Sequence, residues 1–230
     1  MKVSGASRRK RLFRLAALAA ALPVAAACNN TGNSTYAQFY QIARQSLAAT
    51  VGGVRVTREQ AAKIPYASLG YRINEGNEGL LVLATDTGGD LLWTSASRVV
   101  IVTRDGRIVR SVGLDRDVSN LTYREGAAQA PANALKAPFS TTRLADFTDL
   151  GLYGVTITCT ARAAARQSVR ILGQVIATVR VDETCRSNTR NWSFTDSFWV
   201  DPASGLAWRS RQHVHPQGGV VDIQIFRPPG

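Results

Sequence analysis

Alternation of apolar and polar residues dominates the chain after Pro65 and predicts β-strands. Five runs of this kind fill the first part and are separated by turn-forming glycine, asparagine and aspartate; they are 66–73, 79–85, 91–95, 98–104 and 107–112. Six more runs follow at 139–148, 152–163, 168–184, 191–200, 206–215 and 220–227. Short alternating runs with turn signals between them indicate an all-β protein built from antiparallel sheets.

Local signals add a hairpin turn and two short helices to this pattern of strands. Asp105-Gly106 is a pair that two-residue type I′ hairpins favour, because both central residues need positive φ. Apolar residues recur at three-and-four spacing over 35–48, which predicts a short amphipathic helix. Thr57-Arg58-Glu59-Gln60 has the form of a capping box, so we expect a second short helix that ends before Pro65.

Residues 126–138 are small, weakly patterned and flanked by prolines, as is typical of a linker. We therefore expect an all-β fold in which antiparallel sheets form two packed sandwich- or barrel-like halves, with a short N-terminal helix. The expected segments are a signal peptide (1–27), a polar tether (28–35), the N-terminal helix and first β half (36–125), the linker (126–138) and the second β half (139–230).

The first 27 residues have the pattern of a bacterial export signal. A basic stretch over 1–14 precedes an apolar stretch, which ends in small residues immediately before Cys28. This junction resembles a lipobox, although Ala25 stands where leucine is usual, and the resemblance implies a covalent lipid on Cys28. Several acyl chains would hold the protein stably on a membrane. The alternative is plain export that leaves a free thiol. Asn29 is not the aspartate that signals inner-membrane retention in enterobacteria, which favours the outer membrane.

Lipidation of Cys28 would leave Cys159 and Cys185 as an even pair outside the cytoplasm. A disulfide is the natural interpretation in an oxidising compartment, and its stabilisation in the chain-entropy model is roughly 3 to 4 kcal/mol. A redox-active or metal-binding pair is the alternative. It lacks a C-x-x-C motif and a nearby histidine.

Composition places the chain among globular proteins, with 45% hydrophobic residues in 230. The net charge of +12 is concentrated in the signal segment, because removing residues 1–27 leaves 22 basic against 16 acidic residues. The basic residues that remain are almost entirely arginine, so we do not expect nucleic-acid binding. No internal run is apolar and long enough to predict a transmembrane helix.

Alternation in the last predicted hairpin separates two faces. Trp208 and Gln212 share a core face with Ile223, whereas arginines and histidines share the other face with Asp222. A two-residue turn at 217–218 would place His213 opposite Asp222.

Candidate catalytic and metal-binding residues are few. His213 and His215 are the only histidines, and a catalytic zinc needs a third protein ligand, so we expect no metal. No G-x-S-x-G motif is present, which disfavours acyl transfer. A glycosidase needs two carboxylates, which could come from Asp182, Glu183, Asp196 or Asp201. We interpret Asp201 as a turn residue and Glu183 as a surface charge, and therefore predict no catalytic residue.

Several tracts together resemble the YjbF/GfcB (YmcC-like) lipoproteins. They are 64–68 (IPYAS), 91–93 (LLW), 103–114 (TRDGRIVRSVGL), 198–201 (FWVD) and 205–212 (GLAWRSRQ). The resemblance implies an all-β fold, a lipid anchor on the outer membrane, and a role in producing group 4 capsule or another exopolysaccharide. It implies no catalytic residue and no cofactor other than the lipid on Cys28.

The last candidates are residues suited to binding a polysaccharide. They are aromatic residues, whose rings stack on sugars, and arginines, which bind acidic polymers. We expect Trp199 to be exposed. The candidate residues for binding polysaccharide or a partner are Trp199, Arg104, Arg107, Arg110, Arg209, Arg211 and His213. The sequence thus favours a non-enzymatic accessory factor in capsule or exopolysaccharide export or assembly, which binds the polymer or the export machinery. Two alternatives stay open: a periplasmic polysaccharide-modifying hydrolase and a structural envelope lipoprotein.

Overall fold

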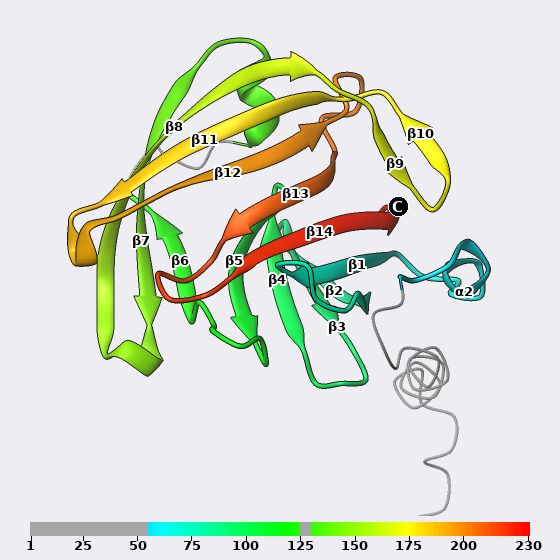
Figure 1. Cartoon of the computed structure of the whole chain (residues 1–230), viewed down its shortest axis with the longest axis horizontal. Helices are drawn as coiled ribbons and strands as arrows, with labels where there is room; N and C mark the ends of the chain where they lie inside the picture. The colour runs from blue at the N-terminus through cyan, green and yellow to red at the C-terminus, as the bar shows by residue number, and fades with distance from the viewer. Residues whose placement is uncertain (1–54, 125–129) are drawn as a thin grey trace, which may run out of the picture. The chain divides into compact units, whose positions relative to one another are not determined.

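The computed structural model describes residues 55–124 and 130–230 (Figure 1). The predicted signal peptide, Cys28, the tether and the helix predicted over 35–48 lie outside the described residues. Within the described part of the chain, no helix has the length and apolar character needed to cross a membrane.

The described part begins with a short helix, α2 (Arg58–Ala62). The Thr57 hydroxyl accepts a hydrogen bond from the Gln60 backbone N–H, and the Gln60 side chain accepts one from the Thr57 backbone N–H. The predicted capping box is therefore confirmed.

In residues 55–124 and 130–230, twelve strands form one antiparallel sheet, so the all-β prediction is confirmed. Their order across the sheet is β5-β4-β3-β2-β1-β14-β13-β12-β11-β8-β7-β6. Their bounds are β1 (Ser68–Ile73), β2 (Gly79–Thr87), β3 (Asp90–Thr94), β4 (Val100–Arg104), β5 (Arg107–Val112), β6 (Asn120–Tyr123), β7 (Phe139–Phe147), β8 (Leu152–Arg166), β11 (Val179–Ser187), β12 (Trp192–Val200), β13 (Ala207–His213) and β14 (Val220–Arg227). A separate hairpin joins β9 (Val169–Ile171) to β10 (Gln174–Ile176). Short 3₁₀ helices occupy Pro131–Leu135, Thr148–Leu150 and Thr189–Asn191.

The sheet is nearly closed because its two edge strands approach each other. The Ser111 N–H, on β5, donates a hydrogen bond of 2.9 Å to the carbonyl of Val118, which precedes β6. Strands from both sides of the predicted linker belong to this one sheet, and β1 joins β14 at its middle. The two expected halves are thus two arms of a single curved sheet. One curved sheet buries the apolar faces of both arms against each other and leaves few free edges.

The inner face carries two apolar clusters with a polar layer between them. On β11, Glu183 lies between Val181 of one cluster and Cys185 of the other. On β12, Asp196 has the same position between Phe198 and Phe194. The interior is therefore divided along the strands into apolar, charged and apolar levels.

Cys159 of β8 and Cys185 of β11 form a disulfide, which confirms the predicted pairing. The two residues are direct cross-strand partners, and their Cα atoms are 4.0 Å apart. The bond therefore locks together two strands of the same sheet in the apolar level next to the charged layer.

Two turn predictions are confirmed and one register prediction is wrong. Asp105 and Gly106 have φ values of 51° and 79° in a two-residue turn, and the Asp201 carboxylate caps its own turn by accepting from the Ala203 N–H. In the last hairpin, Asp222 pairs with Arg211, and His213 pairs with Val220. The loop is longer than predicted because the His215 ring turns inward and packs edge-on against Phe147, with ring centroids 5.1 Å apart.

Candidate binding face and the buried ion network

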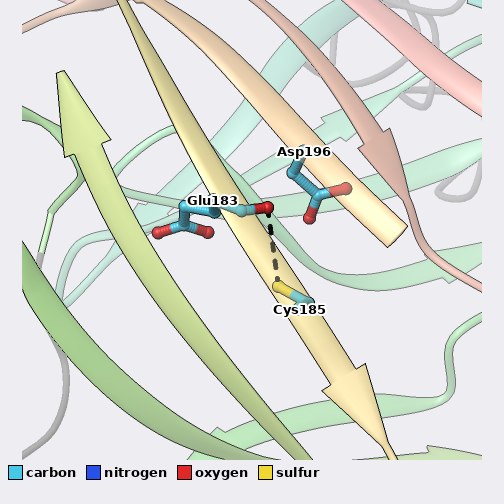
Figure 2. A group of neighbouring side chains, drawn as sticks. All are labelled: Glu183, Cys185 and Asp196. Carbon is cyan, nitrogen blue, oxygen red and sulfur yellow. Dashed lines mark hydrogen bonds between the residues drawn. The ribbon is translucent and has the colours of Figure 1, made fainter. Parts of the chain in front are cut away.

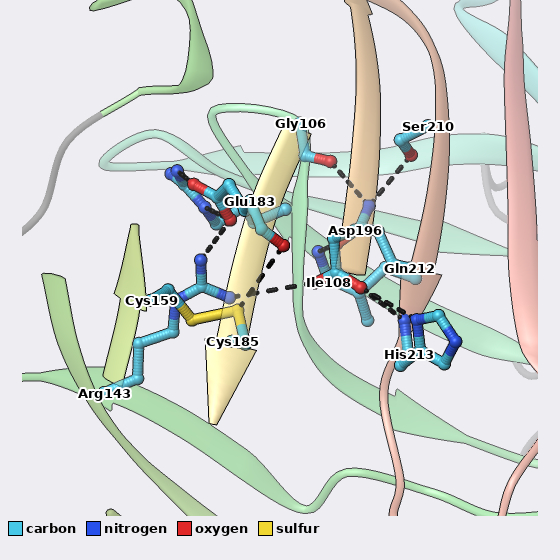
Figure 3. A network of polar contacts seen from close by, with 11 residues as sticks. Gly106, Ile108, Arg143, Cys159, Glu183, Cys185, Asp196, Ser210, Gln212 and His213 are labelled. Atoms are coloured by element: carbon cyan, nitrogen blue, oxygen red, sulfur yellow. Dashed lines mark hydrogen bonds and ion pairs between the residues drawn. A yellow bond between two sulfur atoms is a disulfide. The ribbon is translucent and has the colours of Figure 1, made fainter. Parts of the chain in front are cut away.

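The charged layer of the interior is centred on Glu183, whose side chain is fully buried (Figure 3). Arg107 of β5 and Arg143 of β7 both donate hydrogen bonds to its carboxylate. Glu183 was expected to be a surface charge, and that interpretation is wrong. Alternation places it on the inner face, where two guanidinium groups compensate the cost of burying its charge.

Asp196 extends this layer toward β13. Its Oδ1 accepts a 2.8 Å hydrogen bond from the backbone N–H of His213 and lies 3.2 Å from the Nδ1 of the same residue. Gln212, one residue earlier, crosses the interior, accepting from the Ile108 N–H and donating to the Gly106 carbonyl, both at 2.9 Å. The layer therefore connects β13 to β5 through side chains.

The two buried carboxyl groups differ in their electrostatics. For Glu183, burial would raise the pKa, but Arg143 and Arg107 outweigh this effect and lower it. For Asp196, burial dominates and raises the pKa, despite the hydrogen bonds from His213 and the nearby Arg143. The pKa values of the two buried carboxyl groups are thus shifted in opposite directions, so ionisation becomes easier for Glu183 and harder for Asp196.

This network offers neither a metal site nor a glycosidase site. Potential ligand atoms of Glu183, Cys185 and Asp196 lie within 4.8 Å of one another (Figure 2). The Cys185 sulfur, however, is bonded to Cys159 and cannot act as a thiolate ligand. A glycosidase also needs room for a sugar between its two carboxyl groups, which a retaining enzyme holds about 5 to 5.5 Å apart. The cavity beside Asp196 has a volume of only about 20 Å³, room for a single water molecule.

The predicted binding residues do not form one site. Trp199 was expected to be exposed, and this is wrong, because its side chain is only 6% exposed. It packs beneath the β9–β10 hairpin with Val169 and Ile171, and its indole N–H donates a 3.0 Å hydrogen bond to Gln167. The hairpin covers a position that alternation alone leaves on the outer face.

The three arginines of the β4–β5 hairpin have three different environments. Arg107 points into the interior and is buried, so its predicted role in surface binding is wrong. Arg104 forms a two-point ion pair with Asp90, at 2.6 and 2.7 Å. Arg110 is exposed. These side chains therefore provide no common binding surface.

Arg209 and Arg211 do lie on one outer surface. Arg209 stacks 4.8 Å above the Trp199 ring and forms a two-point ion pair with the buried Asp222. Arg211 is more exposed, and its Nε lies 4.0 Å from the same carboxylate. His213, the last candidate, is half-buried and turns toward Asp196.

Arg209 and Arg211 border a polar surface that the sequence patterns did not predict. The outward positions of β7, β8, β11 and β12, with one position of β13, carry hydroxyl groups, arginines and one aspartate in three cross-strand rows, which we call the hydroxyl–arginine face. The rows are Arg211–Ser197–Asp182–Arg162, Thr195–Thr184–Thr160–Ser140 and Ser193–Arg186–Thr158–Thr142. The alternating threonines at 156, 158 and 160 were the available signal.

A hollow of about 410 Å³ opens at one end of this face. Thr156, Thr158 and Arg186 line it, together with Gly154, Asn188 and Thr189. Within the described residues, the side chains of Arg186 and Arg162 form no hydrogen bond or ion pair. Asp182 is the acidic member of the rows, and it is already bound by Arg180 and Ser197. The face therefore presents guanidinium groups whose charge is not neutralised locally.

Together, these features define the class of molecule: a disulfide-linked antiparallel β protein whose nearly closed sheet is filled by its own side chains. A family model described as group 4 capsule polysaccharide lipoprotein gfcB, YjbF, matches residues 43–226. The chain belongs to this family of membrane-anchored envelope lipoproteins.

Two proteins of Escherichia coli K12 illustrate the relationship. The chain is 25% identical to the uncharacterized lipoprotein GfcB over 173 residues, which cover 75% of this chain and 80% of GfcB. The crystal structure of the hypothetical lipoprotein YmcC matches with a TM-score of 0.68 at 22% identity, covering 86% of this chain and 98% of YmcC. The structural match shows the shared fold.

Proposed function

We propose that this protein is a non-enzymatic accessory factor in the export or assembly of a capsule or related exopolysaccharide. Acylated Cys28 holds it at the outer membrane, facing the periplasm, and the hydroxyl–arginine face contacts the polymer or the export machinery. Membership in a capsule lipoprotein family supports the pathway, and the small residues before Cys28 support the anchor.

The contrast between interior and exterior carries this proposal. Inside the sheet, the charged groups of the network are paired with one another and the cavity beside Asp196 admits no sugar. On the outside, the hydroxyl–arginine face presents unpaired guanidinium groups beside hydroxyl groups. A polymer can therefore contact the outer face, whereas no substrate can reach the buried carboxyl groups of Glu183 and Asp196.

A gene deletion tests the role and the anchor together. We expect deletion to reduce extracellular glycan, measured by staining and by sugar analysis of cell-surface extracts. The wild-type gene should restore the amount, whereas Cys28→Ala should not, because its product lacks the lipid. Mass spectrometry of the mature N-terminus should show acyl chains on Cys28. Unchanged glycan in the deletion strain would contradict the proposed role.

A separate assay addresses hydrolysis. The mature lipoprotein in detergent micelles, incubated with the purified extracellular glycan, should release no new reducing ends. Release that disappears in Glu183→Gln or Asp196→Asn would overturn the accessory role in favour of a hydrolase.

A further inference from the structure

We infer that the hollow beside Arg186 is a subsite for one carboxylate-bearing sugar unit of an acidic polysaccharide, and that the neighbouring units lie across the hydroxyl–arginine face. This inference rests on the proposed function and adds the ligand class and its position. The hollow lies between the outward side chains of β8 and β11 and the segment that follows β11.

The charge of the hollow selects an anion. Among the described residues, Arg186 is the charged member of its lining, and no acidic side chain lines it. Its guanidinium is exposed and forms no hydrogen bond within the described residues, so its planar donors remain available. Arginine recognises carboxylates through two parallel hydrogen bonds, which favours an acidic sugar over a neutral one.

The remaining lining suits the hydroxyl groups of a sugar ring. Thr156, Thr158 and Thr189 supply hydroxyl groups, and Asn188 supplies an amide. These groups both donate and accept hydrogen bonds, as sugar hydroxyls do. The volume of about 410 Å³ lies within the range of small-molecule sites.

The disulfide holds this subsite in shape. Thr158 and Arg186 are direct cross-strand partners, and each is adjacent in sequence to a cysteine of the Cys159–Cys185 bond. The covalent link therefore fixes the separation of the two strands beneath the hollow. A preorganised site loses less conformational entropy when it binds a ligand.

Two other exposed arginines of this face suggest how the polymer continues. Arg162 and Arg211 occupy one cross-strand row, three strands apart, which corresponds to about 14 Å at the usual strand spacing. The row between them and Arg186 consists only of hydroxyl-bearing side chains. An extended acidic chain can thus exchange water for hydroxyl contacts between successive guanidinium groups.

The chemistry of this face favours a glycan over a protein partner. Protein interfaces have apolar and aromatic centres, whereas the three rows that define this face contain only hydroxyl-bearing and charged side chains. An anionic membrane would attract the arginines but would not require the threonine-lined hollow.

The test uses the mature lipoprotein in detergent micelles with oligogalacturonate as probe and its methyl-esterified form as the neutral match. We expect binding of the acidic probe, measured by isothermal titration calorimetry, and little binding of the ester. Arg186→Gln should weaken binding about tenfold or more, and Thr158→Val about threefold. Arg110→Gln removes one exposed arginine elsewhere and should leave affinity unchanged.

Three results would overturn the subsite: equal weakening by Arg110→Gln, equal affinity for the ester, or equal dependence on Arg186 in binding to anionic lipid vesicles. Thr156→Val serves as a second lining variant if Thr158→Val folds poorly. Full affinity in Arg186→Gln, with glycan still lost on gene deletion, would contradict the subsite alone. Weakened binding in Arg186→Gln, with glycan unaffected by deletion, would contradict the proposed function alone.

Discussion

The two sides of β11 use charged residues for different purposes. Glu183 faces inward, where it binds Arg107 and Arg143 and is fully buried. Arg186, three residues later, faces outward, and its side chain forms no hydrogen bond or ion pair within the described residues. Strand alternation therefore decides whether a charge becomes part of the interior or part of a binding surface.

Hydration explains why the inner charges are paired with each other whereas Arg186 on the outer side is not. A buried guanidinium or carboxylate loses its hydration and persists only when it is paired and hydrogen-bonded. An exposed arginine keeps its water and can exchange it for a ligand. The inner charges should thus matter for stability and the outer charges for binding, and four measurements address this contrast.

The largest effect should follow Glu183→Ala, which leaves two buried guanidinium groups without their shared carboxylate. We expect the free energy of unfolding to fall by about 3 to 5 kcal/mol, measured by urea unfolding with tryptophan fluorescence. Asp182→Ala is the matched control on the outer side of the same strand, and its loss should stay below about 1 kcal/mol. Similar losses in both variants would break the contrast.

Removal of the disulfide should have the next largest effect. The double variant Cys159→Ala/Cys185→Ala should lose about 3 kcal/mol, because the unfolded chain gains conformational entropy. Treatment of the wild-type protein with a reductant should reproduce the loss, while the double variant should not respond. If the reductant leaves the wild-type midpoint unchanged, the bond contributes nothing to stability.

A smaller, pH-dependent effect should separate the two inner carboxyl groups. The pKa of Asp196 is raised by burial, so its stabilising contribution is present below the ordinary carboxyl pKa and is lost as pH rises through the raised value. The pKa of Glu183 is lowered overall by Arg143 and Arg107, against the opposing effect of burial, so its contribution is lost as pH falls. Asp196→Asn should therefore be more stable than wild type at pH 8, with an advantage that shrinks toward pH 4. A difference independent of pH, in unfolding curves at both values, would refute this assignment.

The smallest effect on stability should come from the outer face. Arg186→Ala and Arg211→Ala should each change the free energy of unfolding by no more than about 0.5 kcal/mol, as is usual for exposed residues. The same urea experiment measures both. A loss above about 2 kcal/mol would mean that these arginines hold the fold together.

Local features of the structure were predictable from the sequence. The turn at Asp105-Gly106, the capping box at Thr57 and the turn at Asp201 each depend on a few neighbouring residues. The Cys159–Cys185 bond could be predicted by setting Cys28 aside as the expected lipidation site, because only one pair of cysteines then remained.

Features that depend on distant strands were not predictable. The burial of Trp199 requires the β9–β10 hairpin, which the predicted run 168–184 merged with β11. The role of Glu183 requires arginines from β5 and β7, and the sequence has charges at both alternating positions of β11. Single-strand periodicity cannot show which of two charged faces the rest of the sheet will cover.

The hydroxyl–arginine face occupies an intermediate position. Its threonines alternate visibly in the sequence, but their alignment with Arg186 depends on the pairing of β8 with β11. The sequence therefore showed the residues of the site but not the strand register that aligns them.

The position of the last strand has a consequence for biogenesis. β14 lies between β1 and β13, so the first and final segments of the described sheet meet at its centre. A polypeptide truncated before Val220 would leave two detached arms, each with an uncapped hydrogen-bonding edge open to aggregation or proteolysis. Completion of the sheet thus requires synthesis of β14, so cellular quality control can distinguish chains that contain this strand from chains interrupted before it.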